Sequence, residues 1–336
     1  MSKFIKVKLN KELFSTYVGL TISGYDLADK NDVEIAGLYR RISKMDYSQD
    51  VIDYFANART NQNKVNPYWP RGYLLSSACF FISENQPSRY EDFSEHTKFV
   101  RSLTNINPAA LNKELSVWLE QLPQFIDSMI NNKTFADLWK EYQSVIDERA
   151  NKYGEVLEIA DKILNDFLAT SNTSRPDIIF SPNLLQSPFI ADFVSKGNQI
   201  IIIKTSPNVL SIIHEFLHSV FKPFREYFGK YVQTHDFKQI ADITKLISSG
   251  YMWNISEEAK INVLEESFVR GLSIVMNFES SKIIKINDYL RMDVNSGFTM
   301  VPLITKTARN SMPNSSNLRD FITAVMDSGL RRNGKG

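Results

Sequence analysis

Apolar residues are spread around most of the circumference of a helix that we predict over residues 206–221. Ser206 suits the N-cap and Pro207 the first helical position, where a missing N–H removes no hydrogen bond. Pro223 should end the helix, because the residue before a proline is pushed out of the α region. A helix that is apolar on most sides is expected inside a domain rather than on its surface.

Two apolar runs before this helix are typical of strands. Residues 177–180 and 199–205 are rich in isoleucine and are bounded by proline, glycine or asparagine. Upstream of both, apolar residues at helical spacing predict a long helix over 147–170. The order is therefore long helix, strands and buried helix, which favours a mixed α+β arrangement.

The first 146 residues are expected to be mainly helical. Residues 1–9 alternate in polarity as a strand does. Apolar spacing predicts helices over 32–42, 49–58, 92–103, 109–119, 135–146 and, near the other end of the chain, over 285–292 and 318–330. His96 has polar neighbours on both sides, so we expect it to be solvent-exposed. We divide the chain into a mostly helical region, 1–146, and a second region, 147–336.

Three polar residues stand among the apolar residues of the predicted buried helix, and their spacing matches the pattern HExxH. His214 and His218 are four residues apart, so they lie one above the other on one helix face and can point at one metal ion. Neutral imidazole is a favoured ligand of zinc. Glu215 projects beside that face, where its carboxylate can hold a metal-bound water. The alternative interpretation is a core helix whose histidines are only hydrogen-bonded. It would have to account for three buried polar groups at once.

A catalytic zinc ion needs a third protein ligand and one open position. A later helix, predicted to begin at Ser256 and to continue to residue 272, offers Glu265 and Glu266. Helical periodicity places Glu265 among apolar residues, so it should be the more buried carboxylate. The glutamate that does not bind the metal would be solvated, would pair with Arg270 or would orient a histidine.

These motifs resemble the zincin metallopeptidases, and among them the gluzincins, which take the third ligand from a glutamate on a later helix. Residues 266–269 match the later part of the Asn-Glu-Gly-Phe-Ala box of the large gluzincin aminopeptidases. Glu266, Val269 and Arg270 also resemble a recurring segment of an uncharacterised bacterial family with a His-Glu-Phe-x-His helix. The resemblance spans about residues 147–276 and favours Glu266 over Glu265 as the ligand.

The chain also departs from related patterns. No third histidine follows His218 at the HExxHxxGxxH spacing, so the metzincin branch is not expected. Glu265 stands where the aminopeptidase box has asparagine, and no Gly-Ala-Met-Glu-Asn motif is present. An aminopeptidase assignment therefore does not follow.

The resemblance implies an α+β fold with a zincin-like core made of a long helix, a small mixed sheet, the HExxH helix and a downstream glutamate helix. It implies Zn²⁺ held by His214, His218 and Glu266, and peptide-bond hydrolysis by a zinc-activated water with Glu215 as the general base. A peptide or protein substrate could add itself as an extra strand to the edge strand that lines a zincin cleft.

Two questions stay open at this point. A tetrahedral oxyanion needs a further donor, and the candidates, none within a motif, are Tyr251, Tyr289, His235 and Arg270. The alternative function is a non-catalytic binding or regulatory protein on a zincin scaffold. The intact Glu215 argues against that alternative, because a structural metal site needs no general base.

Composition limits the classes of partner and the location that we expect, but it says little about the reaction. The net charge is +1 over 336 residues with both signs interspersed, which gives no nucleic-acid footprint. No apolar stretch approaches the roughly 20 residues that span a bilayer, and the N-terminus lacks a secretory-signal pattern. The single cysteine, Cys79, excludes an internal disulfide. We expect a cytoplasmic protein with a peptide or protein substrate and with no nucleic-acid or membrane partner.

Overall fold

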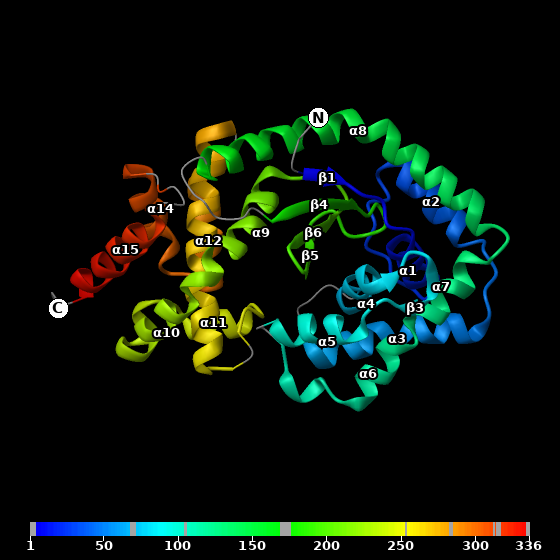
Figure 1. The fold of residues 1–336 in the computed structure, drawn as a ribbon, viewed down its shortest axis with the longest axis horizontal. Coiled ribbons are helices and arrows are strands. Elements are labelled where there is room, and N and C mark those ends of the chain that lie inside the picture. Colours follow the sequence, from blue (N-terminus) through cyan, green and yellow to red (C-terminus); the bar gives the residue numbers. More distant parts are fainter. Residues whose placement is uncertain are drawn as a thin grey trace. The chain divides into compact units, whose positions relative to one another are not determined.

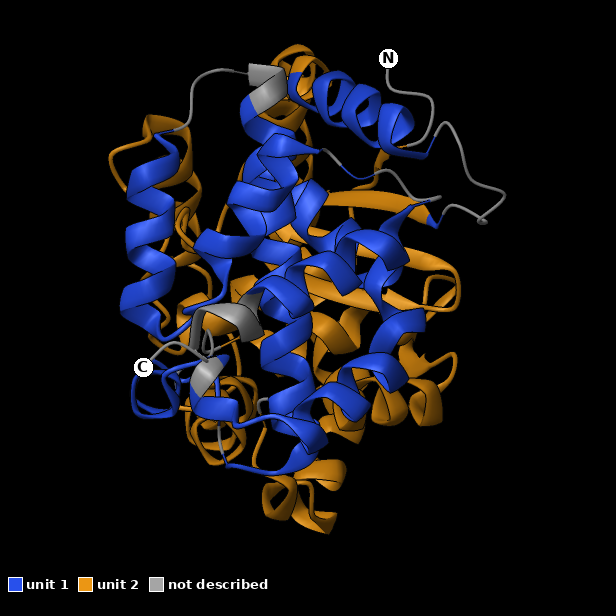
Figure 2. Cartoon of the chain, turned by 90° about the vertical axis from the view of Figure 1, so that its left-hand side faces the viewer, with its two compact units in different colours: residues 1–2, 156–176, 208–336 blue, residues 3–155, 177–207 orange. Residues whose placement is uncertain are grey.

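The computed structural model describes residues 5–67, 72–103, 106–168, 176–252, 254–281, 285–311, 313 and 317–333, without the side chains of residues 239, 279–281 and 329–333. The chain is α+β and mostly helical, with a small mixed sheet, as the sequence predicts (Figure 1). It divides into two compact units, coloured in Figure 2. Unit 1 comprises residues 1–2, 156–176 and 208–336, and unit 2 comprises residues 3–155 and 177–207.

These units do not coincide with the predicted regions 1–146 and 147–336. The two strands predicted before the HExxH helix belong to unit 2, because they share a sheet with the first strand of the chain. The helices predicted over 135–146 and 147–170 form one continuous helix, α8 (Phe135–Leu168), and the boundary between the units falls inside it. No proline separates the two predicted helices, so nothing in the backbone ends the first of them.

The main sheet of unit 2 has the strand order β1 (Ile5–Val7), β4 (Asp177–Pro182), β6 (Gln199–Lys204) and β5 (Asp192–Lys196). The pairs β1–β4 and β4–β6 are parallel, whereas β5–β6 is antiparallel. Burial along nearly all of β4 and β6 explains their continuous apolar sequences. The first strand was predicted over 1–9, of which residues 1–4 lie outside the described part.

The helices of unit 2 pack on this sheet through aromatic side chains. The ring of Phe14 of α1 (Lys11–Ile22) contacts that of Tyr142 of α8 at an angle of 33°, with 4.2 Å between the ring centroids. The Tyr142 hydroxyl donates a 2.7 Å hydrogen bond to the carbonyl of Pro182, at the end of β4. The other elements of unit 2 are α2 (Val33–Ile42), α3 (Gln49–Val65), α4 (Tyr73–Ala78), η1 (Cys79–Phe81), β2 (Ile82–Ser83), β3 (Gln86–Tyr90), α5 (Phe93–Ser102), η2 (Pro108–Ala110), α6 (Lys113–Glu120) and α7 (Leu122–Ile130).

His96 is buried, so the expectation that it is exposed is wrong. It is 0 % exposed in α5 and shares the buried face of that helix with Phe99 and Val100. Its Nε2 lies 3.2 Å from the hydroxyl oxygen of Ser77. Adjacent residues point to different sides of a helix, so the informative neighbours were those three and four positions away.

The centre of unit 1 is the long helix α12 (Glu257–Ser281), which packs against α9 (Val209–Phe221), α10 (Arg225–Thr234) and α14 (Val301–Asn310). Phe268 of α12 meets Phe221 and Phe228, with ring centroids 5.7 and 5.4 Å away. Gly271 permits close approach to α14, because a Cβ there would lie 2.6 Å from Cγ2 of Ile304. The remaining elements are η3 (Lys222–Phe224), η4 (Phe237–Gln239), α11 (Ile243–Ser248), α13 (Ile286–Ser296) and α15 (Leu318–Asn333).

The helix that carries the HExxH pattern begins two residues later than predicted. Its N-cap is Asn208, whose Oδ1 accepts a 3.1 Å hydrogen bond from the Ser211 N–H, so the predicted Ser206 cap is wrong. The helix ends at Phe221, and the following 3₁₀ turn contains Pro223, as predicted. The predicted cap of α12 is confirmed, because Ser256 Oγ accepts a 3.3 Å hydrogen bond from the Ala259 N–H.

Candidate metal centre

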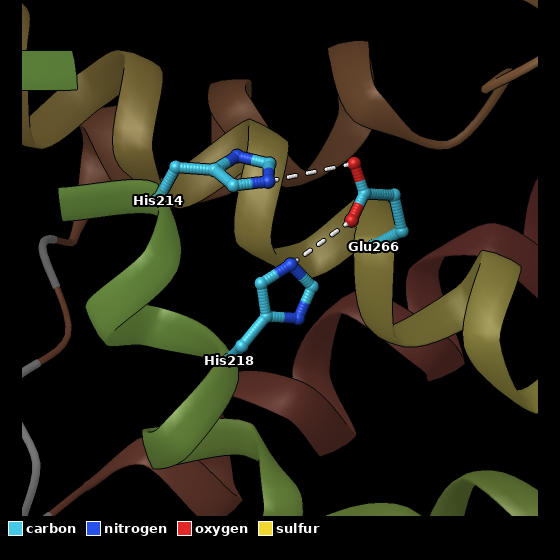
Figure 3. A group of neighbouring side chains, drawn as sticks. All are labelled: His214, His218 and Glu266. Carbon is cyan, nitrogen blue, oxygen red and sulfur yellow. Dashed lines mark ion pairs between the residues drawn. The ribbon is translucent and has the colours of Figure 1, made fainter. Parts of the chain in front are cut away.

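Helix α9 places the two histidines of the HExxH pattern side by side. The ring centroids of His214 and His218 are 5.1 Å apart, and the rings are inclined at 75°. In Figure 3 both rings point away from α9 towards α12, where they meet one carboxylate, that of Glu266. One helical turn therefore brings two potential ligand nitrogens to one place, as the spacing predicts.

Glu266 on α12 faces both rings. Its Oε1 lies 3.6 Å from Nε2 of His214, and its Oε2 lies 3.2 Å from Nε2 of His218 (Figure 3). One ligand atom from each of the three residues lies within 4.8 Å of the others. Two imidazoles and one carboxylate form one of the ligand sets that catalytic zinc uses, so the donor chemistry and the spacing fit that ion.

Glu265 has a different position from Glu266. Its side chain is 8 % exposed, against 19 % for Glu266, which confirms that Glu265 is the more buried carboxylate. Its Oε1 lies 3.1 Å from Nδ1 of His218, on the other side of that ring from Glu266. A carboxylate on the far nitrogen of an imidazole fixes the orientation of the ring.

Arg225 holds Glu265 in turn. Its guanidinium donates to Glu265 Oε2 and to Glu258, and also to Oδ1 of Asn262 at 2.5 Å. Arg225 lies at the start of α10, 40 residues before Glu265, and no motif in the sequence identifies it. The pattern of charges gave no signal for this pair, because only the packing of α10 against α12 creates it.

Arg270 holds the other glutamate. One turn after Glu266 on α12, it donates from Nε to Glu266 Oε1 at 2.6 Å. A second guanidinium nitrogen donates to Oδ1 of Asp293 on α13, also at 2.6 Å. The guanidinium lies over the rings of Phe298 and Tyr251, 4.4 and 4.8 Å from their centroids. The sequence predicts Arg270 as one possible partner of the glutamate that does not bind the metal, but Arg270 pairs with Glu266, and Glu265 instead lies beside His218. No motif in the sequence identifies Asp293 or Phe298.

The surroundings of the site shift the pKa values of its titratable groups in opposite directions. Burial lowers the pKa of His214 to about 3. Burial also lowers the pKa of His218, but the contacts with Glu265 and Glu266 outweigh it and raise the value to about 10. Burial opposes ionisation of Glu266, yet Arg270 and the two histidines hold its pKa well below the usual range. Glu266 is therefore an anion in the folded protein.

Glu215 completes the group of polar side chains on α9. Its Oε2 is buried and accepts no hydrogen bond from the described residues. Burial raises the pKa of Glu215 to about 7. A carboxyl oxygen that is removed from water and lacks a partner is rare in a native fold and calls for an explanation.

The structure separates the four candidates for an oxyanion donor. Arg270 donates to Glu266, and its guanidinium lies over the ring of Tyr251. His235 stacks on Tyr231, with 4.1 Å between the ring centroids, and its Nδ1 lies 2.9 Å from the Tyr231 carbonyl oxygen. Tyr289, on α13, is 36 % exposed.

No family model, curated protein or solved structure matches this chain. The resemblance to zincins therefore stays a prediction based on the motif. Within the part of the chain that the structure describes, no helix is both long and apolar enough to cross a membrane.

Proposed function

We propose that this protein is a zinc-dependent hydrolase that cleaves peptide bonds, built around a gluzincin-like zincin core. One observation carries the proposal: the Nε2 atoms of His214 and His218 face the carboxylate of Glu266, which comes from a later helix. The HExxH pattern on a buried helix is used chiefly for the hydrolysis of peptide bonds.

The residues fit zinc in number and chemistry. Three protein ligands are the number found in catalytic sites, which keep a fourth position open. When bound, zinc polarises a carbonyl oxygen and lowers the pKa of a water in its open position from 15.7 to about 7. Glu265 contacts His218 at Nδ1 and Arg270 contacts Glu266 at Oε1, whereas the 3.2 Å approach between these two ligands joins Nε2 of His218 and Oε2 of Glu266.

Glu215 has the task of moving the proton. Its unpartnered Oε2 takes a proton from the attacking water and returns it to the leaving amine, as a general base that becomes a general acid. A structural metal site needs no such group, which favours a hydrolase over a binding protein on the same scaffold.

The test combines metal analysis with hydrolysis of a quenched-peptide library. Glu215→Gln should retain zinc and lose about 10²- to 10⁴-fold in kcat, because only the proton acceptor is removed. Glu226→Gln is the matched control: it changes an exposed glutamate that pairs with Lys230, and it should leave zinc content and turnover unchanged. Zinc bound to the wild type together with equal, negligible turnover in wild type and Glu215→Gln would favour the non-catalytic scaffold instead.

A further inference from the structure

The two oxygens of Glu266 have different surroundings. Oε1 accepts the 2.6 Å hydrogen bond from Arg270 Nε and lies 3.6 Å from Nε2 of His214. Oε2 is the oxygen that lies close to His218, 3.2 Å from Nε2. A carboxylate can bind a metal ion through one oxygen or through both, so the position of the guanidinium bears on how Glu266 binds.

The guanidinium of Arg270 is fixed on several sides. Asp293 accepts from it at 2.6 Å, and the rings of Phe298 and Tyr251 cover it. The Arg270 side chain is only 19 % exposed. A planar guanidinium that is both stacked and hydrogen-bonded loses little further freedom when it binds a carboxylate. Arg270 can therefore determine the orientation of Glu266.

We propose that Arg270 is a positioning residue that occupies Oε1 of Glu266, so that Glu266 presents Oε2 alone to a divalent cation. This inference rests on the proposed metal site and adds how that site keeps a position open. A cation drawn between both oxygens would move towards the guanidinium, and like charges repel strongly where water is excluded. Binding through one oxygen leaves a position vacant for water or substrate.

Cobalt(II) provides a readout that does not depend on turnover. Co²⁺ takes ligand sets similar to those of Zn²⁺, absorbs visible light and absorbs less strongly when a fifth or sixth ligand joins four. Arg270→Met keeps an unbranched apolar stem beside Tyr251 and Phe298 but removes the donor to Oε1. We expect weaker cobalt absorption per bound metal in this variant and a roughly 10- to 100-fold lower kcat in the zinc form. Arg270→Lys keeps a charged donor and should restore a spectrum close to that of the wild type.

Arg309→Met is the matched control, since Arg309 lies over the Phe278 ring elsewhere in unit 1. Its cobalt spectrum should equal that of the wild type. An unchanged spectrum in Arg270→Met, at equal cobalt content, would overturn the inference and leave the proposed metal site intact. A wild type that binds neither zinc nor cobalt would instead overturn the metal site itself, and the inference with it.

Asp293→Asn replaces Arg270→Met in the cobalt test if circular dichroism shows that Arg270→Met does not fold. This variant keeps the guanidinium but removes the carboxylate that anchors its second nitrogen. A partial loss of cobalt absorption is expected, because the Arg270 donor becomes less well fixed. A spectrum identical to that of the wild type would then refute the positioning role.

Discussion

His96 in unit 2 is buried and His218 in unit 1 is partly buried, with 28 % of its side chain exposed, and their surroundings have opposite effects on the pKa. Around His96 lie Ser77 and aromatic rings, and burial lowers its pKa to about 3. Around His218 two glutamates converge, and the pKa rises to about 10. Burial alone therefore makes a neutral core histidine, whereas several polar groups from different helices make a candidate site.

The supporting groups show the same contrast. Removing a charge from water is expensive unless a partner and hydrogen bonds compensate. In the described part of unit 1, each glutamate beside His218 has its own arginine: Arg225 for Glu265 and Arg270 for Glu266. The Nδ1 atom of His96, in contrast, has no hydrogen-bond partner among the described residues. A chain that only had to bury a histidine would not need two arginines.

Replacing Glu266 should have the largest effect on zinc affinity. Glu266→Gln removes the anionic ligand and leaves Arg270 facing a neutral amide, so we expect at least a roughly 100-fold loss of zinc affinity, more than removal of a supporting group causes. Competition with a chelator and metal analysis measure the effect. Zinc retained by this variant but lost by Glu265→Gln would make Glu265 the ligand.

Replacing Glu265 should have a smaller effect on the same measurement. Glu265→Gln keeps an oxygen near Nδ1 of His218 but removes the charge that orients the ring and pairs with Arg225. Loss of such a support costs about 10- to 100-fold in metal affinity. An affinity equal to that of the wild type would show that Arg225 and Glu265 serve stability alone.

The two glutamates also show how far the sequence could go. Periodicity was sufficient to predict which one is more buried, because both lie on one helix whose register is visible in the sequence. It could not reveal Arg225 or Asp293, since these reach the site only through the packing of α10 and α13. His96 was mispredicted from its adjacent residues, although Phe99 and Val100 carried the helical signal. The division into compact units likewise depends on a contact between segments far apart in the sequence, the pairing of β1 with β4.

The pH dependence of stability tests whether His96 stays neutral in the folded protein. The pKa of His96 is about 3 in the folded protein and that of an unfolded histidine is about 6.5, so the unfolded state binds more protons between these values. The contribution of His96 to stability is therefore complete above pH 6.5 and falls as the pH drops towards 3. It should shrink by about 2 kcal/mol by pH 5.

Urea unfolding at pH 7.5 and pH 5 measures this contribution. His96→Gln keeps a polar group near Ser77 but does not titrate, so its free energy of unfolding should fall less with acid than that of the wild type. Equal pH dependence in the two proteins would show that His96 takes up a proton in the folded state as readily as in the unfolded state, which would contradict a lowered pKa.

Glu258 provides the smallest and most selective change, because it shares Arg225 with Glu265 but is far more exposed. Its side chain is 65 % exposed, against 8 % for Glu265. An exposed ion pair contributes about 0–1 kcal/mol, and Arg225 keeps Glu265 and Asn262 when Glu258 is changed. Glu258→Gln should therefore alter zinc affinity less than about twofold. A loss as large as that of Glu265→Gln would mean that the partners of Arg225 act as one network, in which convergence on the arginine matters more than burial of each carboxylate.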